Sequence, residues 1–589
     1  MWGFWKFPKY TFRRRKICSA HAFCFGLRIS VIIKRHIIWL LLAMRILIVL
    51  LICLLVFAEA EAQRTSFTRQ DTLRGTITPE RAWWDLQHYH LDVFVNPADS
   101  TITGSNTITY RVLESHPRMQ IDLQLPLRID SVMQNEKRLE ATRDGNVWFI
   151  DLADQPVPGK TDQIKVYYSG KPRVARMPPW DGGITWKKDK AGNPFVASSC
   201  QGIGASVWWP NKDHMYDEPD SMLISVRVPP GLTNVSNGRL RGVETHADSS
   251  RTFHWAVQNP INNYGVNINI GDYVHFSDTF PGEKGPLSLD FWVLRQDLKR
   301  AKDYFPKEAT RTMAAFEHWF GPYPFYNDGY KLVQAPYLGM EHQSSVTYGN
   351  NFTFGYMGMD LSRSGWGMKF DFIIVHESGH EWFANNITYR DIADMWIHES
   401  FTAYSEALFV EFHYGKDAGA EYVTGTRANV LNDRPIIGQY GVNHEGSGDM
   451  YYKGANMLHT LRQVLDDDDL WRDMLRGMNE TFRHQTVTTE QIEQYMSNAF
   501  GRDLTPLFDQ YLRDVRIPVL QYYFVDDELH YQWANTVEGF NMPVRVTVGK
   551  QNFLLEPEAD WKQMTITRRK GDLKVDPDFY VTQRGISPP

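Results

Sequence analysis

Two histidines four residues apart, with a glutamate between them, form the segment of this chain best suited to metal chemistry. The segment reads His376-Glu377-Ser378-Gly379-His380. On a helix, residues i and i+4 lie on one face, so both imidazoles can bind the same ion. Apolar residues before and after the segment favour a buried helix over a polar surface loop. The alternative, two histidines packed in a core without a metal, stays open at this point.

A third ligand is needed, because a catalytic zinc ion usually takes three protein ligands and leaves the fourth position to water. Glu399, with 18 residues between it and His380, is the candidate. It lies in a second apolar-periodic segment, Asp394–Tyr404, and a short turn followed by an antiparallel helix would bring it back beside the histidines. His398 is a rival, since adjacent helical residues point about 100° apart and only one can face the ion.

The motif and its spacing resemble the gluzincin aminopeptidases, the aminopeptidase N-like zinc metallopeptidase family that includes the leukotriene epoxide hydrolase branch. Members carry H-E-x-x-H, then 18 residues, then a glutamate. The resemblance continues after the second histidine. There Glu381-Trp382-Phe383-Ala384-Asn385 is similar to the family's x-W-F-G-N, with alanine in place of the usual glycine.

The resemblance implies one Zn²⁺ per chain, with His376, His380 and Glu399 as its ligands. It favours Glu399 over His398, because the family more often has asparagine at the latter position. Glu406 lies two helical turns beyond Glu399 and could hold a zinc ligand in place. A solvated helix carboxylate is the alternative for Glu406.

The chemistry expected of such a site is hydrolysis. Zinc lowers the pKa of bound water from about 15.7 to about 7 and polarises a scissile carbonyl. Glu377, next to the ligands but not one of them, can take the water's proton and pass it to the leaving amine. The segment Tyr451-Tyr452-Lys453-Gly454 resembles the family's Y-x-K-G, whose first tyrosine stabilises the oxyanion. This points to Tyr451, with Tyr452 adjacent to it.

An exopeptidase must also recognise a free amine, and a fixed carboxylate does this by ion pairing. The segment Leu338-Gly339-Met340-Glu341-His342 resembles the family's G-x-M-E-N strand. In that family the glutamate binds the substrate amine and the strand's backbone pairs with the peptide as an added strand. Glu341, Gly339 and Met340 are assigned to substrate binding on this basis, with Gly339 allowing close backbone approach. Leu338 and His342 depart from the pattern and alter the shape of the subsite.

A second contact to the amine is expected from the amino-terminal part of the chain. Ser199-Cys200-Gln201, followed by Trp208–Asp213, resembles the family segment in which a glutamine or glutamate reaches the substrate amine. This assigns Gln201 to substrate binding. A loop glutamine without a role is the alternative.

The fold class expected is α+β with several domains. Residues 63–296 alternate as strands and resemble the family's saddle-shaped β domain. Residues 297–516 turn helical and resemble its thermolysin-like catalytic domain. Residues 517–589 return to strands, enough for a small β-sandwich-like domain. No carboxy-terminal helical domain is expected, and we therefore expect an open active site that tolerates longer peptides.

Residues 1–62 read as a targeting leader. A charged start at Met44-Arg45, an apolar run and an A-x-A site predict cleavage after Ala62, with Met44 as the possible true start. Such a leader predicts export of the protein to the periplasm or the cell exterior. The alternative is an uncleaved anchor over residues 37–57, although it would bury Arg45 in the bilayer.

Charge and cysteine content limit the partners. Residues 1–62 hold ten of the 63 Lys and Arg and two of the 69 Asp and Glu, so the remainder has 53 against 67 and a formal charge of −14. Nucleic acid is therefore an unsuitable partner. Of four cysteines only Cys200 lies beyond the leader, so the mature chain has no internal disulfide.

Together these features predict a zinc-dependent aminopeptidase that acts on peptides and has no stable membrane association once the leader is removed. The alternatives are a related zinc metallohydrolase, either endopeptidase-like or an epoxide hydrolase, and an inactive peptide-binding module. The sequence does not specify side-chain preference or oligomeric state.

Overall fold

The structure is a computed structural model that describes residues 66–566 and 572–588. The predicted leader and its cleavage site lie outside the described residues. From Arg69 onward the chain forms one compact unit. No helix in the described part combines the length and the apolar character needed to cross a membrane.

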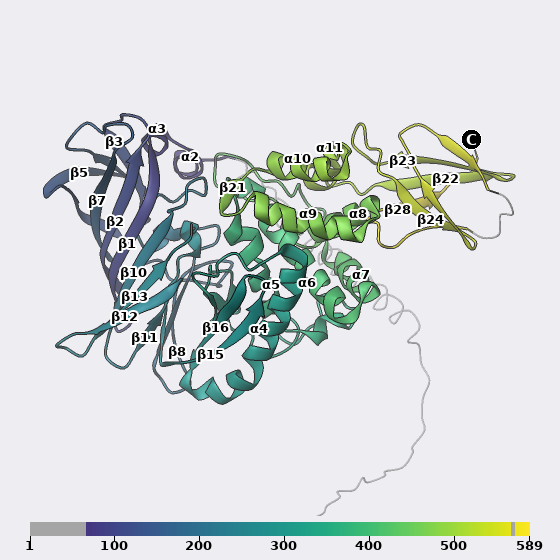
Figure 1. Ribbon diagram of the computed structural model, residues 1–589. Coiled ribbons are helices and arrows are strands. Elements are labelled where there is room, and N and C mark those ends of the chain that lie inside the picture. The colour runs from purple at the N-terminus through teal and green to yellow at the C-terminus, as the bar shows by residue number, and fades with distance from the viewer. Residues whose placement is uncertain (1–65, 567–571, 589) are drawn as a thin grey trace, which may run out of the picture. The chain divides into compact units, whose positions relative to one another are not determined.

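An amino-terminal sheet opens the unit after two short helices, α2 (Arg69–Gly75) and α3 (Pro79–Ala82). Within the described residues it runs in the order β12-β13-β10-β1-β2-β7-β4-β5-β6-β3 (Figure 1). As predicted, alternate residues of its first strand, such as Tyr89 and Leu91, are fully buried. The strands are β1 (Trp84–Asn96), β2 (Thr101–Val112), β3 (Arg118–Asp122), β4 (Arg128–Gln134), β5 (Lys137–Asp144), β6 (Val147–Asp151), β7 (Thr161–Gly170), β10 (Ser221–Val228), β12 (Arg239–Thr245) and β13 (Arg251–Val257).

A smaller sheet runs in the order β11-β14-β9-β8 and shares an apolar core with the amino-terminal sheet. Its strands are β8 (Gly183–Lys188), β9 (Pro194–Ser199), β11 (Thr233–Val235) and β14 (Asn269–Gly271). Strands β8 and β9 form an antiparallel hairpin. The chain leaves β9 directly into Cys200 and Gln201, so this sheet positions the predicted amine contact.

A third sheet, here called the central sheet, has the order β15-β16-β17-β19-β18. Its strands are β15 (Tyr273–Gly282), β16 (Gly285–Leu294), β17 (Tyr330–Gln334), β18 (Gly339–Met340) and β19 (Val346–Tyr348). The boundary predicted at residue 296 assigns β15 and β16 to the amino-terminal β part. The structure instead pairs β16 with β17, because Leu289 and Phe291 pack in the core of the helices that follow.

Helices dominate the chain from residue 298 to residue 508, apart from strands β17–β21 (Figure 1). They are α4 (Leu298–Phe320), α5 (Phe372–Gly379), α6 (Trp396–Tyr414), α7 (Lys416–Gly425), α8 (Tyr452–Leu465), α9 (Asp468–Thr481), α10 (Thr489–Phe500) and α11 (Thr505–Phe508). Helices α4 and α5 contact strands of the central sheet, and α6 contacts α4, α5, α7 and α8. This places α5 and α6 in the interior.

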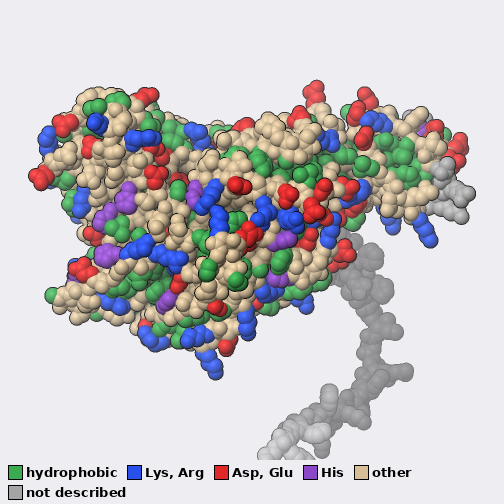
Figure 2. All heavy atoms as spheres, viewed as in Figure 1, with side chains coloured by type: hydrophobic (Ala, Val, Ile, Leu, Met, Phe, Trp, Pro, Cys, Tyr) green, Lys and Arg blue, Asp and Glu red, His purple; other side chains and the backbone are tan. Residues whose placement is uncertain are grey.

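Strands return after residue 518, in two sheets ordered β26-β23-β22-β28 and β25-β24-β27. They are β22 (Val519–Val525), β23 (Glu528–Ala534), β24 (Val544–Val548), β25 (Gln551–Leu555), β26 (Lys562–Thr565), β27 (Leu573–Val575) and β28 (Thr582–Gly585). Their buried side chains, among them Leu520, Trp533 and Val546, belong to the same apolar core as the helices. Basic and acidic side chains are interspersed on the face of the unit drawn in Figure 2. The fold is a mixed α+β architecture, as predicted.

Candidate metal centre and active site

Helix α5 carries His376 and Glu377 and is buried along its whole length. Asp371 caps its start, because its carboxylate accepts hydrogen bonds from the backbone N–H groups of Ile373 and Ile374. His380 keeps a right-handed helical backbone at the carboxyl end. The two imidazoles therefore lie one turn apart, with ring centroids separated by 4.9 Å.

The connection to α6 differs from the short turn expected. Glu381–Asn386 forms a wider π-helical segment that leaves helical geometry at Phe383 and Ala384. Strand β20 (Ile387–Tyr389) follows and pairs with β21 (Gln485–Val487). This detour sets the start of α6 so that Glu399, in its first turn, returns to the histidines.

The structure brings the three predicted ligands together. Glu399 Oε2 lies 3.7 Å from His376 Nε2 and 3.4 Å from His380 Nε2. All three residues are buried, and one ligand atom from each lies within 4.8 Å of the others. The described residues thus contain a compact set of two imidazole nitrogens and one carboxylate oxygen, the donor set of many catalytic zinc sites.

Each histidine is fixed from behind by its other ring nitrogen. His376 Nδ1 lies 2.7 Å from Glu406 Oε1, and Glu406 Oε2 accepts a hydrogen bond from the Tyr422 hydroxyl at 2.6 Å. His380 Nδ1 lies 3.0 Å from the Phe383 carbonyl oxygen. Glu406 is buried, so it is not the solvated carboxylate considered as its alternative. Both Nδ1 atoms therefore carry the proton, which leaves each Nε2 with a free lone pair.

The fit of a zinc ion follows from these contacts. When both rings are neutral and donate Nδ1–H, their Nε2 lone pairs and Glu399 Oε2 face one another. Glu399 Oε2 is also buried and has no hydrogen-bond partner among the described residues. Converging acceptors repel unless a cation lies between them, because burying unpaired polar groups costs free energy. The residues present therefore fit a zinc ion.

His398, the rival ligand, turns away from this cluster. Its Nε2 accepts a hydrogen bond from the Tyr389 backbone N–H at 2.9 Å, and its Nδ1 lies 3.5 Å from the Tyr264 hydroxyl. The ring stacks on Tyr389, with centroids 4.1 Å apart. His398 holds β20 against α6.

Glu377 faces a cavity of about 320 Å³ that is also lined by His376, His380 and Glu399. Burial raises the pKa of the Glu377 carboxyl, and although the charge of His376 opposes this shift, the charge of Glu341 adds to it. Gly339 presses against Glu377 from the central sheet. A Cβ at position 339 would lie 2.7 Å from Glu377 Oε1 and 2.7 Å from a methyl carbon of Ile373.

Tyr451 borders the same cavity from the start of α8. Its ring lies nearly parallel to that of His376, with centroids 6.1 Å apart. Burial raises the pKa of Tyr451 well above its usual value, and the charge of Glu399 adds to the shift, so the phenol stays a neutral donor. Tyr452 also lines the cavity, but its charged neighbour is Glu406, behind the zinc ligands.

Glu341 follows the edge strand β18 and lines the cavity beside the ligands. Its Oε1 is buried and has no partner among the described residues. Burial raises the pKa of this carboxyl; the charge of His380 opposes the shift, and that of Glu399 adds to it. Met340 contributes backbone only, since its side chain packs into the core of the amino-terminal sheet. Leu338 lines the cavity, and His342 is buried with Nδ1 2.7 Å from the Thr347 hydroxyl.

Gln201 reaches the ligands from the other side. Its Nε2 donates to Glu399 Oε1 at 2.8 Å, and it lines the cavity. The structure thus brings Gln201 to the predicted site, where it contacts a zinc ligand.

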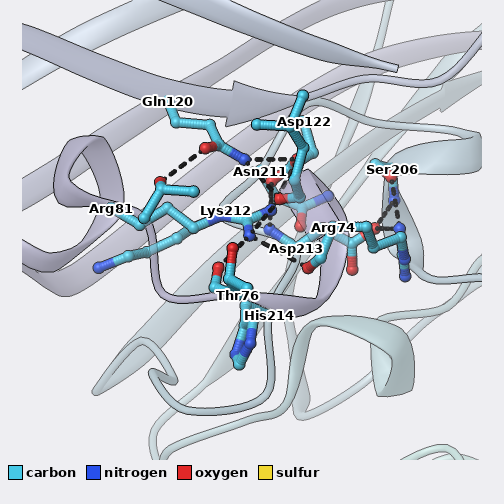
Figure 3. A network of polar contacts seen from close by, with 12 residues as sticks. Arg74, Thr76, Arg81, Gln120, Asp122, Ser206, Asn211, Lys212, Asp213 and His214 are labelled. Atoms are coloured by element: carbon cyan, nitrogen blue, oxygen red, sulfur yellow. Dashed lines mark hydrogen bonds and ion pairs between the residues drawn. The ribbon is translucent and has the colours of Figure 1, made fainter. Parts of the chain in front are cut away.

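A polar network fixes residues 206–213, which follow Gln201 along the chain (Figure 3). Asp213 accepts from Arg74 at 2.8 Å and from the Ser206 backbone N–H at 2.9 Å. Asp122 on β3 accepts from Arg81 at 2.7 Å and from the Asp213 backbone N–H at 3.0 Å. The sequence motif Trp208–Asp213 includes Asp213, but the sequence did not indicate Arg74, Arg81 or Asp122. Partners up to 139 positions apart leave no local pattern.

Comparison with known proteins agrees with this site. Residues 306–511 match the Peptidase family M1 domain. Mouse aminopeptidase B is 23% identical over 77% of this chain and 72% of its own length. Aminopeptidase N of Lactobacillus helveticus is 23% identical over 75% of this chain and 52% of its own. These matches relate the chain to peptidase family M1. The predicted relationship to the gluzincin aminopeptidases is confirmed. The chain is therefore a zinc metallo-aminopeptidase, a hydrolase with one Zn²⁺ as cofactor.

Other relatives extend the comparison. Leukotriene A-4 hydrolase of Xenopus laevis is 23% identical over 74% of this chain and 71% of its own length. An M1 zinc metallopeptidase from Deinococcus radiodurans shares the fold, with a TM-score of 0.61 and 21% identity over 74% of this chain and 94% of that one. A mutant of that enzyme bound to a Tyr-Ser-Ala substrate gives a TM-score of 0.60 at 20% identity, over 74% of this chain and 95% of that one. This chain thus spans between about half and nearly all of the length of these related proteins.

Proposed function

We propose that this chain removes amino-terminal residues from peptides, with Glu377 as general base and Tyr451 as the donor to the oxyanion. The observation that carries the proposal is the unpaired, buried carboxylate oxygen of Glu341 in the same cavity as the ligand set. A buried charge without a partner is costly, and a substrate ammonium would supply the partner.

The residues of the cavity account for each proton movement. A bound zinc ion would supply a water of lowered pKa and polarise the scissile carbonyl. Glu377 takes the proton from the attacking water and delivers it to the leaving amine, breaking the bond between the first and second residues. The raised pKa of Glu377 favours holding that proton between the two transfers.

Stabilisation of the developing negative charge is assigned to Tyr451. Its hydroxyl remains protonated because burial and Glu399 raise its pKa, so it can donate to an oxyanion without losing its proton. Its place at the start of α8 is set by neighbours: the Met450 carbonyl accepts from Ser400 on α6 at 2.6 Å.

Substrate orientation is assigned to the edge of the central sheet. Strand β18 pairs with β19 on one side only, which leaves backbone groups for an added peptide strand. Glu341 and Gln201 then face the first residue of the peptide from two elements. Nothing else in the cavity distinguishes a free amine from a blocked one as directly.

At the level of architecture, we propose a saddle-shaped β domain, a thermolysin-like catalytic domain and a small carboxy-terminal β domain, with boundaries near 296 and 516. The order of strands, helices and strands along the described chain supports this division. Strands β15 and β16 belong to the first part in this division, and their sheet continues across the boundary through the pairing of β16 with β17.

We further propose that the enzyme works outside the cytoplasm, as a protein free of membrane and nucleic acid once the leader is removed. The charged start, apolar run and A-x-A site of residues 1–62 support this, as does the net charge of −14 beyond them. Amino-terminal sequencing of the exported protein should begin at Gln63.

The experiment that tests the proposed activity is a panel of aminoacyl fluorogenic substrates, with and without a chelator and with zinc restored. We expect hydrolysis that the chelator abolishes and zinc restores. Hydrolysis that persists after complete zinc removal would contradict the proposal, as would a zinc-loaded protein inactive on the whole panel.

A further inference from the structure

A second cavity, of about 470 Å³, adjoins the active-site cavity and is not used by the chemistry above. The two cavities share Leu338 as a lining residue. The second is bordered by residues 335–338 before β18, by the tip of the β8–β9 hairpin at 188–190, and by residues 349–353 after β19. It therefore lies along the chain that leads into the edge strand.

The direction of a bound peptide follows from the order of residues on that strand. Glu341 faces the amine of the first residue, and Gly339 lies against Glu377, where the bond between residues one and two is cut. The peptide thus runs from Glu341 toward Leu338, antiparallel to β18. Each further residue advances by about 3.3 Å, so the third and fourth residues lie beside Tyr337 and Pro336.

These two positions line the second cavity. A tripeptide or tetrapeptide aligned in this way ends inside it, with its carboxylate among the lining residues. A longer peptide continues past the cavity to solvent. The second cavity is therefore placed to sense the end of a short substrate.

The side chains that line this cavity carry a small positive excess, from Lys188, Lys190 and Arg300 against Asp189 and Asp297. Lys188 and Lys190 have no ion-pair or hydrogen-bond partner in the part of the chain that the structure describes, whereas Arg300 donates to the Phe352 carbonyl oxygen at 3.2 Å. Of the acidic lining residues, Asp189 accepts from the Ala191 and Asn193 backbone N–H groups, and Asp297 accepts from Gln334. The two carboxylates thus have hydrogen-bond donors of their own, whereas the two lysines have no such partner among the described residues.

The hairpin that carries these lysines is fixed to the wall of the cavity. Lys187 donates to the Pro336 carbonyl oxygen at 2.9 Å, and the buried Phe195 packs in the core on the other hairpin strand. Asp189, which lies between the two lysines in the sequence, accepts the hydrogen bonds that close the hairpin turn. The hairpin backbone that carries both lysines is therefore fixed beside the wall where the peptide would end.

We propose that this cavity binds the carboxyl-terminal carboxylate of short peptide substrates, three to five residues long, through Lys188 and Lys190. The proposal rests on the proposed aminopeptidase function and deepens it, because it names short peptides with a free carboxylate as the favoured substrates. Exposed ion pairs are weak individually, so two of them favour the free acid by about 3–10-fold. Salt weakens the preference by screening.

The test compares peptides of two to seven residues that share one amino-terminal residue and end in either a free carboxylate or an amide. For the parent enzyme the ratio of kcat/KM, acid over amide, should be highest at three to five residues, about 3–10-fold, and fall toward one at seven. In Lys188→Gln/Lys190→Gln the ratio should approach one at every length. Both lysines are exposed, so the variant keeps the core intact.

The matched control is Lys160→Gln/Lys574→Gln, which removes the same charge from two exposed positions outside the cavity. It should retain the parent's ratio. A ratio near one in the parent, or a preference that survives in Lys188→Gln/Lys190→Gln, would overturn the cavity assignment while leaving the aminopeptidase proposal in place. Inactivity on the peptides and on aminoacyl fluorogenic substrates alike would overturn both.

Discussion

The two sides of the active-site cavity differ in how their polar groups are paired. On the ligand side, both histidines donate their outer N–H, His376 to Glu406 and His380 to a carbonyl oxygen, and Glu406 is itself held by Tyr422. On the substrate side, Glu341 presents a buried oxygen with no partner among the described residues. The first arrangement orients a resident ion, and the second leaves a charge for a substrate to neutralise.

This difference shows which side chains must be held rigidly and which must keep a polar atom free for the substrate. A metal ligand loses affinity when its orientation is loose, so its supports are satisfied within the protein. A substrate contact must be remade in each turnover, so its partner comes from outside. The substrate side is nevertheless held in place, since Gln201 leads into a segment fixed by the Asp213 and Asp122 network.

The largest effect is expected from the residue that works between the two sides. Glu377→Gln removes the base and keeps the shape, so kcat should fall by about 10²–10⁴-fold while zinc content stays at one per chain. Rates on an aminoacyl fluorogenic substrate and metal analysis of the same sample measure both. A variant as active as the parent would contradict the assigned role.

The second largest effect is expected from a substitution on β18 that crowds Glu377. Gly339→Ala would place a Cβ 2.7 Å from Glu377 Oε1 and from an Ile373 methyl carbon, so the base must move. Misplacing a catalytic group by about 1 Å can cost about 10²-fold, and kcat should fall by that order.

The control for this change is Gly242→Ala on β12, where an added Cβ meets nothing within 4 Å. It should keep the parent's rate. Equal rates for the two alanine variants would show that the close approach at Gly339 does not position Glu377.

A smaller effect separates the two carboxylates of the comparison. Glu406→Gln should weaken zinc binding by about 10–100-fold, because the His376 ring loses its charged support. The same substitution on the substrate side, Glu341→Gln, should leave zinc affinity near the parent's and raise KM. Competition with a chelator measures the first quantity and steady-state kinetics the second. Equal loss of zinc affinity in both variants would contradict the assignment of Glu406 to zinc binding and of Glu341 to substrate binding.

The smallest effect concerns stability and a buried carboxyl outside the active site, that of Glu218. Burial raises the pKa of Glu218 to about 8, and one of its carboxylate oxygens has no partner in the described residues. The unfolded chain loses this proton near its ordinary pKa of about 4.3, so the stability contributed by Glu218 falls as pH rises from there to about 8.

Glu218→Gln should therefore unfold at a higher temperature than the parent at about pH 9 and near the same temperature at about pH 4. The expected gain at high pH is on the order of 1–2 kcal/mol, reduced because the side chain keeps some contact with solvent. Glu140→Gln, at an exposed position on β5, is the matched control. No gain over this control at high pH would refute the assignment.

The sequence predicts the ligand side well because its information is local. Histidines at i and i+4 and a glutamate at a fixed distance determine which atoms can meet, and the apolar residues around them predict burial. His398 and Glu399 could be separated only by the family resemblance, and the structure shows the physical reason: His398 is engaged by Tyr389 and Tyr264.

The substrate side and the sheet boundaries were harder to predict for the opposite reason. The π-helical segment after His380 and the pairing of β16 with β17 depend on packing between distant residues. The same holds for the contact of Gln201 with Glu399, 198 residues apart. Alternating apolar residues predicted that β15 and β16 are strands, but alternation does not say which sheet a strand joins.

The central claim is that Glu341 receives a free amino terminus beside the zinc ligands. It is tested most directly by the hydrolysis of one peptide in its free and its acetylated form, by the parent enzyme and by Glu341→Gln. We expect the parent to cleave the free form at least about 30-fold faster, since the acetylated form leaves Glu341 unpaired, and we expect Glu341→Gln to lose most of that selectivity. Cleavage of both forms by the parent at similar rates would contradict the account.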